Sequence, residues 1–116
     1  MSVTIYHNPR CSKSRQTLQL LQDRGIQPHI IEYLQSPPDV ATLRDILAKL
    51  GMASARDLMR KNEPEYTEGN LAAAERSEDE LLTALRAQPK LMERPVVMAN
   101  GKAAIGRPPE NVLDIL

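Results

Sequence analysis

The residue best suited to covalent chemistry in this sequence is Cys11, the single cysteine of the chain. Residues 7–15 contain no acidic side chain, and the cations among them are Arg10, Lys13 and Arg15. Positive charge favours the thiolate over the thiol, which lowers the pKa of a cysteine and makes its sulfur nucleophilic near neutral pH. We therefore interpret Cys11 as an activated nucleophile, although a lone cysteine is more often a buried and inert residue.

The elements expected on either side of Cys11 would strengthen its activation. Residues 3–7 are rich in β-branched and aromatic side chains and end at an Asn-Pro pair, so they predict a short strand. Residues 12–24 contain no Gly or Pro and are followed by Gly25, which predicts a helix with its C-terminal cap. A thiol between this strand and this helix meets unpaired backbone N–H groups and the positive end of the helix dipole.

Spacing excludes several chemistries related to that of an activated thiol. A dithiol redox centre needs a Cys-x-x-Cys pair, and Ser14 occupies the place of the second cysteine. A cysteine phosphatase loop carries an arginine six residues after its cysteine, where this chain has Thr17. One cysteine and two histidines are fewer ligands than a zinc site uses, so we expect no metal. His7 is interpreted equally well as a hydrogen-bonded strand-end residue or as a modulator of the thiol pKa.

The arginines are the second chemical signal, because a guanidinium binds a tetrahedral oxyanion as a bidentate fork that lysine cannot reproduce. Arg94 directly precedes Pro95 at the start of a predicted hairpin, and Arg107 follows the end of that hairpin. Arg60 stands at the end of a short predicted helix. Most surface arginines are solvated charges, so their spacing alone identifies these three only as candidates for binding an oxyanion.

The remaining elements complete an α/β pattern. Beyond the first strand and helix, the sequence predicts a strand at 29–33, helices at 40–50, 54–61 and from 77 onward, a hairpin of 95–99 and 102–106, and a last helix from 108. Residues 62–76 are polar and irregular. The order of elements predicts one domain over residues 1–116, with a four-stranded mixed sheet and helices on both faces.

Composition restricts the classes of partner. Fifteen basic and fifteen acidic residues give a net charge of zero, which argues against broad binding to nucleic acid or to an anionic membrane. The sequence shows no membrane-spanning apolar run and no secretory signal, and a lone cysteine suits a reducing compartment. We expect a cytoplasmic monomer.

Four segments together resemble the glutaredoxin-coupled arsenate reductases of the ArsC family, in their compact enterobacterial branch. These segments are IYHNPRCSKSRQTL (5–18), DLMRKNEP (57–64), LMERPVV (91–97) and IGRPPENVLDIL (105–116). They occur in the same order as in the family and together extend over essentially the whole chain. The resemblance implies a thioredoxin-like fold with flanking helices and a helical insertion at about residues 39–90.

The resemblance also implies roles for individual side chains. Cys11 would be the nucleophile and His7 would help to activate its thiol. The oxyanion and the arsenical intermediate would be held by an arginine triad of Arg60, Arg94 and Arg107. The anion loop would be shaped by Asn8 and Ser14. A cis-proline junction at Arg94-Pro95 would face the cysteine. The implied reaction reduces arsenate to arsenite through a cysteinyl-arsenate intermediate. Glutathione would be the thiol co-substrate, glutaredoxin would resolve the mixed disulfide, and no cofactor would be bound.

Two other interpretations remain open. The first keeps the activated thiol but assigns it another oxyanion or a glutathione mixed disulfide, because Ser12 and Lys13 stand where better-known family members carry Gly and Thr. The second comes from a different class, a non-catalytic regulator of the Spx type. Such regulators typically carry a Cys-x-x-Cys switch, which this chain lacks at Ser14.

Overall fold

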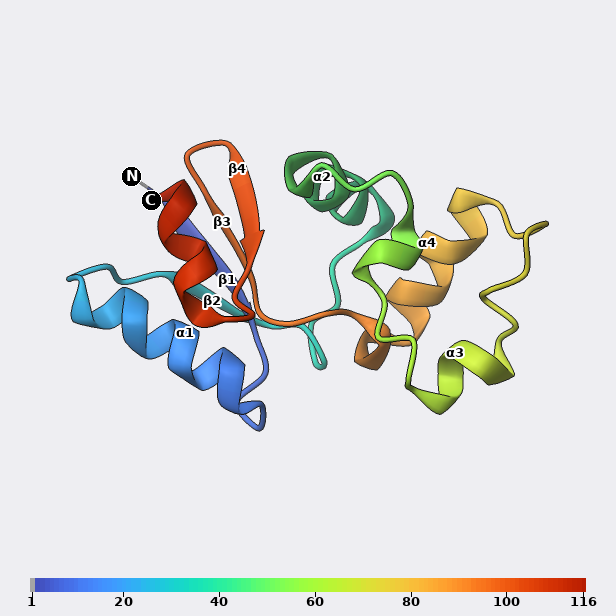
Figure 1. Cartoon of the computed structure of the whole chain (residues 1–116), viewed down its shortest axis with the longest axis horizontal. Helices are drawn as coiled ribbons and strands as arrows, with labels where there is room; N and C mark the ends of the chain where they lie inside the picture. The colour runs from blue at the N-terminus through green and yellow to red at the C-terminus, as the bar shows by residue number, and fades with distance from the viewer. Residues whose placement is uncertain (1) are drawn as a thin grey trace. The chain divides into compact units, whose positions relative to one another are not determined.

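The computed structural model describes residues 2–116 and divides into two compact units. The first unit holds the described residues up to Ser36 together with Arg94–Leu116, and the second holds Pro37–Glu93. In chain order (Figure 1) the elements are β1 (Val3–His7), α1 (Ser12–Asp23), β2 (His29–Glu32), α2 (Val40–Leu50), η1 (Ala55–Leu58), α3 (Pro64–Glu68), α4 (Glu78–Ala87), η2 (Pro89–Leu91), β3 (Val96–Ala99), β4 (Lys102–Ile105) and η3 (Pro109–Ile115). Along the chain, the second unit therefore lies between β2 and β3.

The first unit contains a four-stranded mixed sheet with the strand order β2-β1-β3-β4. β1 pairs in parallel with β2, whereas β1 with β3 and β3 with β4 are antiparallel. Ile5 lies at the centre of this arrangement, opposite Ile30 on one neighbour and Val97 on the other. The mixed sheet predicted from the sequence is confirmed.

Helices α1 and η3 pack on the same face of this sheet (Figure 1). The sequence predicted helices on both faces, but the two helices of the first unit share one face because their apolar side chains join a single core. Their common core consists of the buried residues Val3, Ile5, Leu21, Val97, Ala99, Val112 and Ile115. These side chains come from both central strands and from both helices. Fully burying one such aliphatic side chain contributes about 1.5–3 kcal/mol, so this core holds α1 and η3 against the sheet.

The hairpin of β3 and β4 turns at Asn100 and Gly101, as the sequence predicts. Their φ angles are 55° and 74°, the positive values that a two-residue turn requires. The peptide bond between Arg94 and Pro95 is cis, in agreement with the junction implied by the family resemblance. A second cis bond, which no feature of the sequence predicted, joins Arg107 to Pro108.

The second unit is helical, and its boundaries follow from side chains that cap helices. Asp39 accepts the backbone N–H of Thr42 at the start of α2, and Gly51, at φ 70°, ends that helix. Ser77 and Glu80 form a reciprocal capping box at the start of α4. The core of this unit is made mainly of leucines from α2, η1, α4 and η2: Leu43, Ile46, Leu58, Leu81, Leu82, Leu85 and Leu91.

Three helical predictions differ from the structure in detail. The short helix predicted at 54–61 is a 3-10 helix of four residues, because Met59 leaves the helical conformation and bridges to Met92 as extended chain. The stretch at 62–76, predicted as irregular, contains α3, which begins with a proline at its first position. The last helix is 3-10 rather than α-helical.

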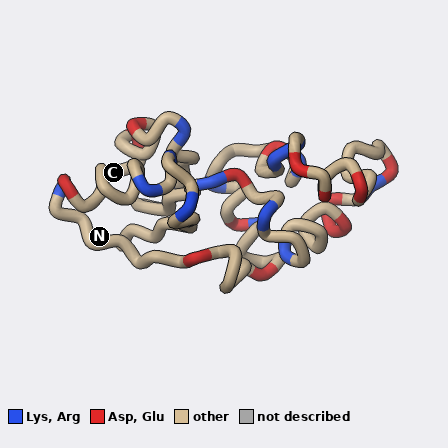
Figure 2. The backbone as a smooth tube through the Cα atoms, turned by 90° about the horizontal axis from the view of Figure 1, so that it is seen from below, with Lys and Arg blue, Asp and Glu red and all other residues tan. Residues whose placement is uncertain are grey.

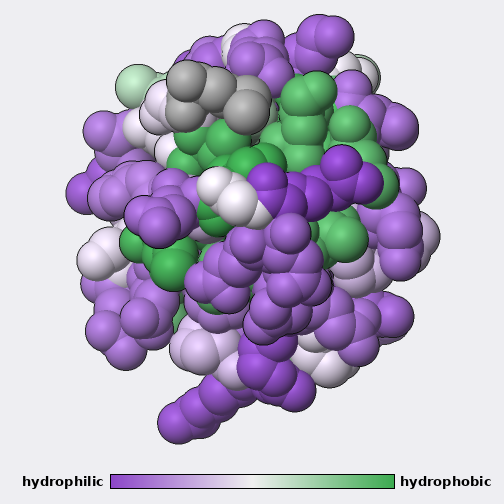
Figure 3. Space-filling model, turned by 90° about the vertical axis from the view of Figure 1, so that its left-hand side faces the viewer, coloured by the Kyte–Doolittle hydropathy of each residue, from purple (hydrophilic) through white to green (hydrophobic). Residues whose placement is uncertain are grey.

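Charges of both signs are interspersed along the backbone (Figure 2), as the zero net charge predicts. The face shown in Figure 3 is mostly hydrophilic, with a smaller area of apolar residues at its centre. Across residues 2–116, the large apolar side chains that are exposed are Ile30 and Leu34. Within the same residues, no helix combines the length and apolar character needed to cross a membrane.

Candidate active site

Cys11 lies at the N-cap of α1, directly after the turn that ends β1. The backbone N–H of Cys11 closes this turn by donating to the carbonyl oxygen of Asn8 at 3.0 Å. The Asn8 side chain supports the same turn, because its Oδ1 accepts the backbone N–H of Arg10 at 3.0 Å. The carbonyl of Cys11 then accepts the first helical bond, from the N–H of Arg15. The thiol is half-buried at the start of the helix.

The surroundings of Cys11 favour its thiolate. Partial burial raises the pKa of the Cys11 thiol, but the backbone N–H of Ser14, the Arg94 guanidinium and the backbone N–H of Lys13 together outweigh burial, so the pKa lies below its usual range. The thiol makes no capping hydrogen bond of ordinary geometry to α1. The two N–H groups therefore act on the thiolate chiefly as nearby, well-oriented dipoles.

Two of the predicted arginines meet at this thiol, although more than eighty residues separate them from it in the chain. Arg107 Nη1 lies 3.8 Å from Cys11 Sγ and 3.4 Å from the carbonyl oxygen of Arg94. The Nε atom of Arg94 is buried and has no hydrogen-bond partner among the described residues. A buried, unpaired donor is costly, and an oxyanion next to the thiol would supply its missing acceptor.

The third predicted arginine, Arg60, belongs to the second unit. Its Nη1 pairs with Glu63 Oε1 at 2.9 Å, across a turn in which the backbone N–H of Glu63 donates to the carbonyl oxygen of Arg60. Glu63 Oε2 in turn lies 3.6 Å from Lys90 Nζ. The guanidinium of Arg60 is thus engaged by a carboxylate, whereas the donors of Arg94 and Arg107 lie beside the thiol.

His7 contacts Ser14, which links it indirectly to Cys11. His7 Nδ1 lies 2.6 Å from Ser14 Oγ, and the same hydroxyl oxygen accepts the backbone N–H of Asn8 at 3.0 Å. Burial lowers the pKa of His7, Glu32 opposes this effect and Arg15 adds to it, so the pKa lies below its usual range. When His7 is neutral with its proton on Nε2, its Nδ1 accepts a hydrogen bond from the Ser14 hydroxyl group. His7 and Asn8 therefore fix Ser14, whose backbone N–H faces the thiol.

The arrangement is a single thiolate with anion-binding donors. Residues 2–116 contain no group of three or more His, Cys, Asp or Glu side chains that could hold a metal ion. A nucleophilic sulfur beside two guanidinium groups and a helix N-terminus suits attack on an oxyanion whose negative charge these donors stabilise.

Comparison with known proteins identifies the family of the chain. The model of the ArsC family matches residues 6–115. The chain belongs to the ArsC family. Across 98% of its length it is 60% identical to the uncharacterized protein YfgD of Escherichia coli (strain K12), of which it covers 96%. It is 50% identical over the full length of both chains to a protein of Haemophilus influenzae named arsenate reductase.

Solved structures of the ArsC family confirm the fold. The chain superposes on the structure titled arsenate reductase from Vibrio cholerae with a TM-score of 0.97 and 51% sequence identity, covering 100% of this chain and 98% of that one. The agreement shows that the thioredoxin-like arrangement predicted from the family resemblance is correct.

Gly106 is a site residue of this ArsC chain that sequence reasoning missed. Its backbone N–H donates to the carbonyl oxygen of Pro95 at 3.0 Å, immediately before Arg107. A Cβ atom at this position would lie 2.9 Å from Pro95 Cγ, which is too close, and would also overlap the side chain of Thr17 in α1. The helix that carries Cys11 and the two arginine-bearing segments therefore converge where only a glycine fits. Gly106 has no positive φ, so its only sequence signal is its place before Arg107.

Filling this space should disturb the thiol. We expect Gly106→Ala to lower the free energy of unfolding by about 1–3 kcal/mol, because overpacking forces backbone shifts. Since those shifts separate the helix N-terminus from the arginines, the pKa of Cys11 should rise. Urea unfolding and the pH dependence of Cys11 alkylation measure the two effects.

A second substitution tests whether crowding between the new methyl group and Thr17 causes the change in the thiol pKa. Thr17→Ala in the Gly106→Ala background removes the atoms that the new methyl group would meet, so it should restore part of the low thiol pKa. Thr17→Val in the same background keeps the volume and should restore nothing. A Gly106→Ala variant with wild-type stability and thiol pKa would contradict the packing argument.

The lowered pKa of His7 predicts a pH-dependent stability. Between the lowered folded pKa and the ordinary value of about 6.5, the unfolded chain binds more protons at this residue, so stability rises with pH. We expect the free energy of unfolding to fall as the pH drops below about 6.5, and His7→Gln to flatten this part of the profile. Urea unfolding across this range measures the effect. His29→Gln, at an exposed position, is the control, and equal pH slopes in wild type and His7→Gln would contradict the prediction.

Proposed function

We propose that this chain reduces arsenate to arsenite, with Cys11 as nucleophile and glutathione as thiol co-substrate. The observation that supports this most strongly is the lowered pKa of Cys11 beside the buried, unpaired Nε of Arg94. The name arsenate reductase, carried by full-length relatives at 50–51% identity, supports arsenate as the oxyanion.

In the proposed reaction the Cys11 thiolate attacks arsenic(V), an arsenic–oxygen bond breaks, and that oxygen leaves as water. The donors of Arg94 and Arg107 bind the remaining arsenate oxygens and stabilise their negative charge. Glutathione then supplies the second thiol, and the two thiols together lose two electrons while arsenic(V) becomes arsenic(III). The products are arsenite and a disulfide between Cys11 and glutathione. In the net reaction, the released water carries the arsenate oxygen and the two protons of the two thiols.

The mixed disulfide must be reduced from outside, because the chain has no second cysteine. A glutaredoxin thiolate attacks the glutathione sulfur of this disulfide and releases Cys11 as a thiolate, the better leaving group because of its low pKa. The glutathionylated glutaredoxin is then reduced by a second glutathione. Glutathione is consumed as a substrate and is not a resident cofactor.

Arsenite formation tests the proposal. The purified chain is incubated with arsenate, glutathione, glutaredoxin, glutathione reductase and NADPH, and each component is omitted in turn. We expect arsenite only when arsenate, glutathione and the chain are present together, and much slower turnover without glutaredoxin. If no arsenite forms although Cys11 alkylates as a low-pKa thiol, arsenate is the wrong substrate. Other oxyanions and glutathionylated peptides are then the substrates to screen.

A further inference from the structure

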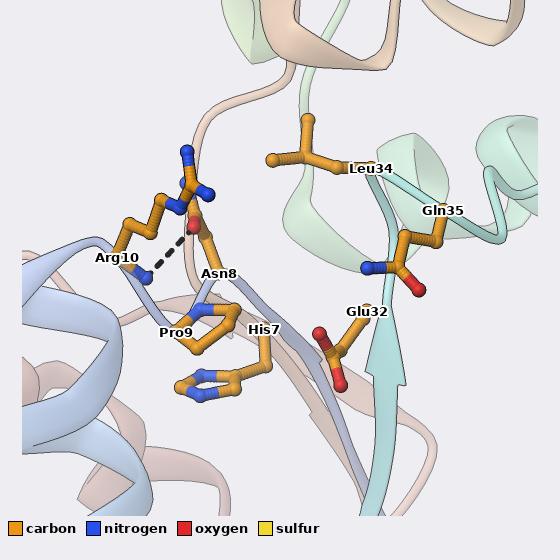
Figure 4. A pocket seen from close by; sticks show the side chains of 7 residues that line it. All are labelled: His7, Asn8, Pro9, Arg10, Glu32, Leu34 and Gln35. Carbon is orange, nitrogen blue, oxygen red and sulfur yellow. Dashed lines mark hydrogen bonds between the residues drawn. The ribbon is translucent and has the colours of Figure 1, made fainter.

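A small cavity opens beside the turn that leads to Cys11, at the carboxyl ends of the parallel strands β1 and β2 (Figure 4). Its volume is about 150 Å³, and its walls include the Asn8-Pro9-Arg10 turn on one side and Glu32, Leu34 and Gln35 on the other. Ligands of open α/β sheets bind outside the carboxyl ends of strands. Pockets for whole small-molecule ligands measure roughly 300–1,000 Å³, so this cavity is sized for the end group of a larger molecule.

Opposite charges line this cavity without meeting each other. Arg10 approaches it from the turn, and Glu32 from the end of β2 (Figure 4). Within residues 2–116, neither the Arg10 guanidinium nor the Glu32 carboxylate has a hydrogen-bond or ion-pair partner, and the Gln35 side-chain amide also has none. A free anion would be repelled by Glu32 and a free cation by Arg10. An end group that carries both a negative and a positive charge could pair with Arg10 and with Glu32 at the same time.

We propose that this cavity binds the zwitterionic γ-glutamyl end of glutathione. This inference rests on the proposed function, in which glutathione delivers the second thiol to the Cys11 adduct. The γ-glutamyl end carries an ammonium group and a carboxylate on one carbon atom. Arg10 pairs with the carboxylate, Glu32 pairs with the ammonium, and Gln35 supplies a further hydrogen bond.

The distance to Cys11 is compatible with this placement. Asn8 and Cys11 are the first and last residues of a turn closed by a 3.0 Å hydrogen bond, and such residues lie within about 7 Å of each other. An extended chain advances about 3.3–3.6 Å per residue, so the two-residue length from the γ-glutamyl end to the glutathione sulfur is about 7 Å. The two lengths match, so the turn that lines the cavity places Cys11 at a separation that the glutathione sulfur can span.

Thiol–disulfide exchange tests this binding without arsenate. The Cys11 thiolate attacks one sulfur of oxidised glutathione, forming the mixed disulfide and releasing one glutathione thiolate. The rate is compared with that for bis(2-hydroxyethyl) disulfide, which carries no charge. We expect Arg10→Gln and Glu32→Gln each to slow the reaction with oxidised glutathione by about tenfold relative to the uncharged disulfide, the effect of losing one charge-assisted hydrogen bond.

A control variant and a second disulfide substrate show which part of glutathione the cavity binds. Arg24→Gln removes an exposed cation at the other end of α1 and should leave the rate ratio unchanged. The disulfide of γ-glutamylcysteine, which lacks the glycine, should respond to Arg10→Gln and Glu32→Gln as oxidised glutathione does. Loss of that response would place the glycine carboxylate in the cavity instead and overturn the proposal. An unchanged rate ratio in Arg10→Gln and Glu32→Gln would overturn it as well.

The exchange assay and the arsenite assay can succeed or fail separately, so they test the cavity and the arsenate reaction independently. If the exchange ratio falls in Arg10→Gln and Glu32→Gln but the wild type makes no arsenite, the cavity recognises glutathione and the oxyanion substrate is a different one. If arsenite forms but the exchange ratio is constant across these variants, the reaction stands and the cavity has no part in it.

Discussion

Replacing Cys11 by serine is expected to abolish arsenite formation and leave the fold intact. A serine hydroxyl does not ionise near neutral pH and cannot form a disulfide with glutathione, so both covalent steps are lost. Cys11 is only half-buried and contributes little to either core. Arsenite production under the complete glutathione system measures activity, and thermal unfolding measures the fold.

The matched control for this substitution is Ser12→Ala. Ser12 is exposed and adjacent to the nucleophile, so its variant reports on any general disturbance of the helix N-terminus. We expect Ser12→Ala to keep most of the wild-type activity. Substantial turnover by Cys11→Ser would remove Cys11 from the mechanism.

The second large effect is expected from Arg94→Lys. This change keeps one positive charge but replaces the guanidinium fork by a single ammonium group, and it removes the buried Nε donor. Loss of one donor to a developing oxyanion typically lowers kcat about 10²–10³-fold, so we expect kcat/KM for arsenate to fall by about that factor. Because Arg94 also lowers the thiol pKa, the pKa of Cys11 should rise in the same variant.

Steady-state kinetics with varied arsenate measures the first of these effects, and Arg24→Lys is the control. Arg24 is exposed at the C-terminal cap of α1, and its substitution makes the same chemical change away from the thiol. Unchanged kinetics in Arg94→Lys would show that Arg94 is a solvated scaffold residue.

Much of the fold follows from local sequence signals. β1 and α1 could be predicted because a β-branched run and a Gly-free, Pro-free stretch meet at an Asn-Pro pair, and the hairpin because Asn100-Gly101 accepts positive φ. The 3-10 helices could not be predicted, because they share the composition of short α-helices. Their hydrogen-bond pattern is decided by how the chain packs, as the bridge between Met59 and Met92 illustrates.

The site could be predicted only in part. Local charge and the helix N-terminus pointed to Cys11, but spacing alone left Arg94 and Arg107 as two candidates among ten arginines. Only the family resemblance placed them at the thiol, and the order of the strands shows how they reach it. The close approach of Gly106 to Thr17 has no local signal, because it depends on how the segment after β4 lies against α1. The pair of Arg60 with Glu63 could not be predicted, because it spans a turn outside the helices and only the structure shows that it forms.

A pH titration of Cys11 shows directly whether its thiol is activated. The alkylation rate of the chain's single thiol is followed across pH, which reports its thiolate fraction without any assumption about substrate. We expect a midpoint clearly below the ordinary value of about 8.5, moved upward in Arg94→Lys. A midpoint at or above about 8.5 in the wild type would contradict the account, because the helix N-terminus and the arginines would then not activate the thiol.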